Sequence, residues 1–183
     1  MRLTAISLSL AAALLTASAA VAQTPPAPAP TNPPAGGTPE QMPFATPYGT
    51  PIGAARAQQL VNAVLAEAAK HPTWRFNIAV VDPNGDLVYF YRMDGAQIGS
   101  IVISQGKART ATRYRRETRA FYNTYEAGHQ YVSTLDPTLV ASPGGFPLIE
   151  KGRIIGAIGC SGGTGDQDAA VCGAGAAALP NTH

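Results

Sequence analysis

The sequence has little charge of either sign and few of the residues on which common catalytic sites depend. Only 13% of its 183 residues are charged, and it contains three histidines and two cysteines. The formal net charge is +2, or +1 without Arg2, so no overall field attracts nucleic acid or an anionic membrane. No Ser-His-Asp, HExxH or paired-carboxylate pattern is recognisable. The sequence therefore predicts no nucleic-acid partner, and it leaves open whether the chain is an enzyme.

Residues 1–22 have the pattern of a secretory signal peptide. Arg2 precedes a short apolar run that ends in Ala-Val-Ala at positions 20–22, and we expect cleavage before Gln23. An uncleaved anchor helix is less favoured because the run is short, rich in alanine and followed at once by prolines. No cysteine follows the run, so a lipid anchor is not expected there. We expect a periplasmic or secreted protein with no membrane span after cleavage.

A proline-rich segment at 23–51 separates the signal peptide from the rest of the chain. It holds ten of the sixteen prolines, with Ala, Thr and Gly between them. Such a composition buries too little apolar surface to offset the entropy of ordering, so we expect a disordered, partly polyproline II linker. A ligand for a proline-reading domain is a weaker alternative. Residues 52–179 are expected to form one domain with a single core, followed by a tail at 180–183.

The segment 78–95, IAVVDPNGDLVYFYRMDG, predicts a β-hairpin. Two apolar runs flank Asp-Pro-Asn-Gly at 82–85, a sequence suited to a tight turn. Both faces of the second strand are apolar, so we expect helices on each side of the sheet, or a partner subunit over one face. The hairpin delivers Arg92 and Asp94 to one end of the sheet, where both are candidate ligand-binding residues.

Hydrophobic spacing and turn residues predict the order of the other elements. We expect a helix at 52–71, a helix at 98–114 and a second or broken helix at 118–131. A second hairpin follows at 146–160, and the last helix, at 165–179, opens with a capping box of Thr and Gln. Helices before, between and after antiparallel strands predict an α+β fold.

Six basic residues and one acid lie between 107 and 119. In a helix, Arg109, Arg113 and Arg116 would share one face, and most of this face is expected to be solvated. A subset could bind a carboxylate, and Lys107 could act as a base or an anion clamp if it is buried. Lys107 and Arg109 are therefore candidate ligand-binding residues.

Two glycine-rich stretches are further candidates for a binding loop. Ser161, Gly162 and Gly163 lie between a strand and a helix N-terminus, where backbone N–H groups and the helix dipole favour an anion. Alternatively, the glycines only make a tight turn, and acidic residues in the first helical turn already answer the dipole. Gly144 and Gly145 belong to a possible substrate loop at 142–145.

The two cysteines are close in sequence. Cys160 lies at a strand end, and Cys172 lies about two turns into the next helix. In an oxidising compartment this pair is expected to form a disulfide, which would stabilise the fold by about 3 kcal/mol. Two unpaired buried thiols are the alternative, and a zinc site lacks suitable further ligands.

Five blocks along the chain resemble the GlcG/HbpS-like family of haem-binding proteins. They are YGTPI at 48–52, AVVDPNGDLVYFYRMDGA at 79–96, KARTA at 107–111, GGFPL at 144–148 and GRIIGAIGCSGGTGDQD at 152–168. The resemblance implies a profilin-like fold with a roughly five-stranded antiparallel sheet, assembly into homo-oligomers and, for some exported members, haem binding. It implies function poorly, because the family also includes domains fused to cobalamin-related enzymes and members encoded beside glycolate metabolism.

If the ligand is haem, the iron needs an axial donor such as His, Cys, Met or Tyr. His71 ends a helix and His183 ends the chain, which leaves His129 as the candidate by elimination, although an ordinary surface histidine is the better interpretation. Tyr89, Tyr91 and Tyr114 could also ligate or stack on haem, but packing in the core is their ordinary use. No c-type attachment motif is present, so haem would bind non-covalently. We therefore expect an exported homo-oligomer that binds a small ligand, haem for storage, sensing or degradation. An enzyme or binding module for a glycolate-like organic acid and a structural or interaction module are the alternatives.

Overall fold

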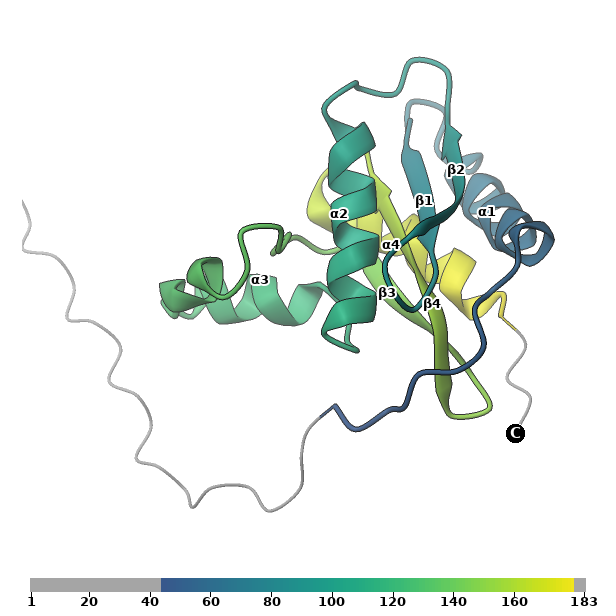
Figure 1. Cartoon of the computed structure of the whole chain (residues 1–183). Coiled ribbons are helices and arrows are strands. Elements are labelled where there is room, and N and C mark those ends of the chain that lie inside the picture. The colour runs from purple at the N-terminus through teal and green to yellow at the C-terminus, as the bar shows by residue number, and fades with distance from the viewer. Residues whose placement is uncertain (1–43, 180–183) are drawn as a thin grey trace, which may run out of the picture.

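The computed structural model describes residues 44–179 (Figure 1). The expected signal peptide at 1–22, residues 23–43 of the expected linker and the tail at 180–183 lie outside the described residues. Within the described part, no helix is long and apolar enough to cross a membrane.

The centre of the domain is an antiparallel sheet in the order β2-β1-β4-β3. Its strands are β1 (Asn77–Val81), β2 (Leu87–Arg92), β3 (Gly145–Glu150) and β4 (Arg153–Ser161). The sequence predicted both hairpins and the α+β class, and both are confirmed. Four strands form where roughly five were expected.

Just before the first helix, the chain makes one further contact with the sheet. There the chain runs beside β4: Gly49 donates to the Ile154 carbonyl and Ile154 donates to that of Pro47, at 2.8 Å each. The contact stays an isolated parallel bridge between Tyr48 and Ile154. Because the prolines at 47 and 51 have no N–H to donate, this segment cannot extend the ladder into a strand.

Helices cover both faces of the sheet (Figure 1). On one face lie α1 (Ala54–Ala68) and α4 (Gly165–Ala177), and on the other lies α2 (Ser100–Arg113). α3 (Arg119–Glu126) and the 3-10 turn η1 (Gln130–Thr134) extend sideways from the body. β2 lies at an edge of the sheet and is only half-buried, although its residues are apolar on both sides.

The helix boundaries follow the sequence signals closely. The helices expected at 52–71, 98–114 and 165–179 are α1, α2 and α4, and the Thr164–Gln167 capping box is present. The segment 118–131 is a broken helix because Gly128 adopts a φ of +88° between α3 and η1. That left-handed conformation suits glycine and stops the helix.

The two faces of the sheet bury different kinds of residue. Large aliphatic and aromatic side chains fill the layer under α1 and α4, whereas alanines dominate the layer under α2. Gly159 lies directly beneath α2, next to the Ala108 backbone. Small residues on both sides let α2 approach the sheet closely, and this brings Lys107 of α2 to the strand ends.

Candidate functional site

A buried ion pair joins α2 to α4. Lys107 Nζ lies 2.6 Å from Asp168 Oδ2, and the two side chains are 1% and 3% exposed. The same ammonium donates a hydrogen bond of 2.7 Å to the Pro143 carbonyl. Lys107 thus connects two helices and the loop before β3, and it meets the condition of burial on which its candidate role as a base or anion clamp depends.

Asp168 also fills the glycine-rich loop after β4. Its Oδ1 accepts hydrogen bonds from the N–H groups of Gly162 at 3.0 Å and Gly163 at 2.9 Å. These are the donors that the sequence offered to an external anion. In the structure the carboxylate of the protein itself holds them, so an external ligand would have to compete with Asp168.

The two glycines at the start of β3 pack against the same pair. A Cβ on Gly144 would lie 2.8 Å from the Asp168 Cβ, and one on Gly145 would lie 2.5 Å from the Lys107 carbonyl oxygen. Neither position leaves room for a side chain. Five predicted site residues therefore converge on the Lys107–Asp168 pair: Lys107 itself, Gly144, Gly162 and Gly163 next to Asp168, and Gly145 next to the Lys107 backbone.

Burial and charge act in opposite directions on this pair. Desolvation raises the pKa of the Asp168 carboxyl, against the lowering effect of the Lys107 charge and of the hydrogen bonds to the carboxyl. Desolvation likewise lowers the pKa of the Lys107 ammonium, against the effect of Asp168. Each charge is sustained in the interior by its partner.

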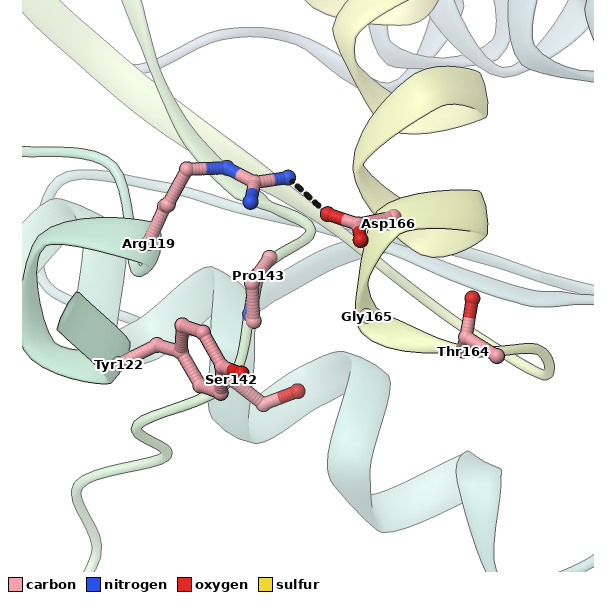
Figure 2. A pocket seen from close by; sticks show the side chains of 7 residues that line it. All are labelled: Arg119, Tyr122, Ser142, Pro143, Thr164, Gly165 and Asp166. Atoms are coloured by element: carbon pink, nitrogen blue, oxygen red, sulfur yellow. Dashed lines mark hydrogen bonds and ion pairs between the residues drawn. The ribbon is translucent and has the colours of Figure 1, made fainter. Parts of the chain in front are cut away.

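Pro143, whose carbonyl binds Lys107, also lines a pocket of about 270 Å³ (Figure 2). The pocket lies between α3, the loop before β3 and the first turn of α4. Its lining residues are Arg119, Tyr122, Ser142, Pro143, Thr164, Gly165 and Asp166. Arg119 Nη2 lies 2.8 Å from Asp166 Oδ1, so the positive charge of Arg119 is already paired with a carboxylate.

A second, more open hollow of about 360 Å³ lies where β2 ends beside α1. Its lining residues are Leu65, Ala69, Arg75, Tyr91, Met93 and Asp94. Met93 Sδ accepts a hydrogen bond of 3.3 Å from the Phe76 backbone N–H. The hollow combines an aliphatic wall, a guanidinium, a phenol and a thioether within one surface.

Ser161 and Arg92 lie in one row across the sheet, since both pair in register with Asn77. The Ser161 hydroxyl donates to that of Ser100 at 3.0 Å, beneath the start of α2. Arg92 donates to the Ala96 carbonyl at 3.2 Å. Both residues lie at the end of the sheet that the sequence predicted. Among the described residues, neither side chain forms a hydrogen bond with Lys107 or Asp168.

Arg109 and His129 lie apart from both hollows. Arg109 Nε donates to the Gly85 carbonyl at 3.1 Å, which ties the first hairpin turn to α2. His129 precedes η1, partly exposed, with its ring edge-on to Tyr131. Among the described residues, no group of three His, Cys, Asp or Glu side chains could hold a metal ion.

The two cysteines form a disulfide in the structure. The Cα atoms of Cys160 and Cys172 are 5.5 Å apart, and both residues are fully buried under α1 and α4. The bond joins the end of β4 to the middle of α4. It therefore closes the strand-to-helix connection that contains the glycine-rich loop.

Sequence reasoning placed Asp168 only in the first turn of a helix, where it would answer the dipole. Its contacts with Lys107, 61 residues away, carried no signal in a single sequence. The sequence also did not reveal the open hollow, although Tyr91, one of its lining residues, is among the candidate haem ligands. The alternation of β2 placed Tyr91 and Met93 on one face of the strand, and this signal could have found them together.

The fold defines the class of protein: an α+β domain with helices on both faces of a four-stranded antiparallel sheet. The crystal structure of HbpS superposes with a TM-score of 0.66 and 29% identity, over 73% of this chain and 93% of that one. The crystal structure of a PduOC–haem complex gives a TM-score of 0.65 and 26% identity, over 71% and 96%.

Residues 52–177 match the family model described as haem degrading protein HbpS-like. The chain is also similar to protein GlcG of Escherichia coli strain K12, with 42% identity over 108 residues. That alignment covers 57% of this chain and 80% of GlcG. The chain therefore belongs to the HbpS-like family, which confirms the resemblance seen in its sequence.

Proposed function

We propose that this chain is an exported protein that binds haem non-covalently as a homo-oligomer. The observation that carries the proposal is the shared fold with PduOC, which is known as a haem complex, together with membership of the HbpS-like family. Among the described residues, the open hollow at the end of β2 is the surface whose chemistry fits haem best.

The side chains of the hollow match the parts of a haem. Iron takes axial ligands such as a phenol or a thioether, and Tyr91 and Met93 offer one of each. Leu65 supplies an apolar wall for the porphyrin. Arg75 is an exposed cation suited to a propionate, and Asp94 would repel one, so the propionates should point toward Arg75.

The openness of the hollow supports an oligomer. Its volume is at the low end for ligand pockets, and a ligand that is held well buries most of its surface. A haem lying there would keep one side uncovered within a single chain. A second copy could cover that side, which is why the proposal includes a homo-oligomer.

Two features support export. The pattern of residues 1–22 is that of a signal peptide, and the buried disulfide suits an oxidising compartment.

A haemin titration with spectral detection tests the proposal. The mature chain should develop a Soret band, and the double substitution Tyr91→Phe with Met93→Leu should weaken binding by about tenfold or more, or about 1.4 kcal/mol. Both changes keep the size and apolar character of the side chains while removing the donor atoms. His129→Ala should bind as the original chain does.

Two results would count against the proposal. A chain that gives no spectral change with micromolar haemin does not bind haem. Loss of the band in His129→Ala, with the double variant unaffected, would show that the axial ligand is His129, the candidate from the sequence, and not a residue of the hollow.

A further inference from the structure

α3 and η1 form an arm with three exposed tyrosines. Tyr122, Tyr125 and Tyr131 are 38%, 43% and 60% exposed, and we call them the tyrosine face. Tyr122 and Tyr125 are three residues apart on α3, so they lie on the same side of the helix. The only buried residue of α3 is Phe121. An arm of this kind exposes aromatic surface that single soluble domains usually cover.

The described chain begins at the base of this arm. The Arg116 guanidinium stacks on the Phe44 ring, 3.9 Å from its centroid, and on the Phe121 ring at 4.3 Å. Arg115 donates to the Phe44 carbonyl at 3.4 Å and stacks on Tyr48. Through Arg116, Phe44 is held next to Phe121, the residue before Tyr122. The proline-rich segment is attached to the domain at Phe44, and therefore close to the tyrosine face.

A buried donor at the same place lacks a partner. Among the described residues, nothing accepts a hydrogen bond from the Arg116 Nε–H, although the atom is buried. A buried guanidinium donor without an acceptor is costly. An acceptor from outside the described residues would satisfy it, and Phe44, to which the upstream chain is attached, stacks on the same guanidinium.

The upstream segment has the composition that tyrosines bind. Residues 23–43 contain eight prolines and a single acid, Glu40. Polyproline II chains leave their carbonyls free and dock on aromatic-lined surfaces. At about 3.1 Å per residue, seven residues before Phe44 reach about 22 Å, whereas the eight-residue α3 is about 12 Å long.

We propose that the proline-rich residues 23–43 fold back along the arm and cover the tyrosine face. The tether through Phe44 gives the segment an effective concentration in the millimolar range, which sustains weak stacking that free peptides would not show. The docked segment would also pass Tyr122, a wall of the pocket beside α4.

Tyrosine modification of the full mature chain tests this contact. The chain is treated with limiting tetranitromethane, and nitration of each tyrosine is followed by peptide mass spectrometry. Replacing the eight prolines of 23–43 with serine should speed nitration of Tyr122, Tyr125 and Tyr131 on the order of threefold. Tyr91, which is 39% exposed on the distant β2, is the internal control and should not change.

Equal nitration rates in the two chains overturn the proposal. The proposal is also overturned if the tyrosines are protected from nitration only at high protein concentration, whether or not the prolines are present. That result would show that a second copy of the chain covers the tyrosine face. A complementary variant, Arg116→Lys, removes the Nε–H and the planar stacking while keeping the charge. It should raise nitration of Tyr122 in the original chain and leave the serine-substituted chain unchanged.

Discussion

Replacing Lys107 with methionine should lower the free energy of unfolding by about 3–5 kcal/mol. Methionine fills a similar volume, so the loss comes from charge and not from a cavity. Without the ammonium, the Asp168 carboxylate stays buried with only the N–H groups of Gly162 and Gly163 as partners. Urea denaturation followed by circular dichroism measures the change.

The pH dependence of this variant distinguishes lost pairing from a packing defect. Burial raises the pKa of Asp168, and the charge of Lys107 opposes that rise. Once Lys107 is gone, the pKa in the folded protein lies further above its unfolded value of about 3.9. The folded state then binds more protons than the unfolded state, so stability falls as pH rises. The deficit relative to the original chain should be largest at neutral pH and shrink toward pH of about 4.

A double variant provides the matched control. Asp168→Asn leaves an oxygen for the two glycine N–H groups, and combined with Lys107→Met it leaves no buried charge. We expect the double variant to be more stable than the sum of the two single losses predicts, by about 1–3 kcal/mol. Simple additivity, or a Lys107→Met deficit that does not vary with pH, would show that the pair contributes only packing.

Local features of this fold were accessible from the sequence because their causes are local. The turn at 82–85 forms because the Asp82 carboxylate accepts from the N–H groups of Asn84 and Asp86, and Gly85 adopts a φ of +93°. The capping box of α4 likewise involves residues only three apart. Such patterns specify structure within a few residues, and their predictions were confirmed.

The candidate site depends on distant contacts and was only partly accessible. The glycines of the loop after β4 correctly indicated converging N–H donors, but the acceptor is Asp168 of the protein itself. The sequence could not decide between an external anion and an internal one. That choice depends on how far α2 carries Lys107 into the interior, which is set by the alanine and glycine contacts between α2 and the sheet.

The arm and the sheet edge show the same limit in another form. The sequence indicated a second or broken helix at 118–131, but not that α3 would bury only Phe121. The segment before α1 belongs to the expected linker, yet Gly49 and Ile154 hydrogen-bond across an isolated bridge beside β4. In both cases the position of the segment relative to the core decided the outcome, and that position is not encoded in the local pattern.

Removing the disulfide should also cost about 3 kcal/mol of unfolding free energy. Cys160 and Cys172 are 12 positions apart in the sequence, and in the chain-entropy model a loop of that size restricts the unfolded chain by about this amount. Both sulfurs are buried between β4 and α4, so the double substitution with alanine also loses packing. Thermal and urea denaturation of the Cys160→Ala, Cys172→Ala variant measures the total.

A second variant separates the crosslink from the packing. Cys160→Ala with Cys172→Val restores apolar volume without a bond, so the deficit that remains reflects the crosslink. Reducing the original chain after unfolding should lower its stability to that of this variant. Because the bond is buried, reduction of the folded chain should be slow, and a chain made in an oxidising compartment should show no free thiol when unfolded without reductant. Full labelling of both thiols there, or a deficit below about 1 kcal/mol, would show that the fold depends on packing in this region and not on the bond.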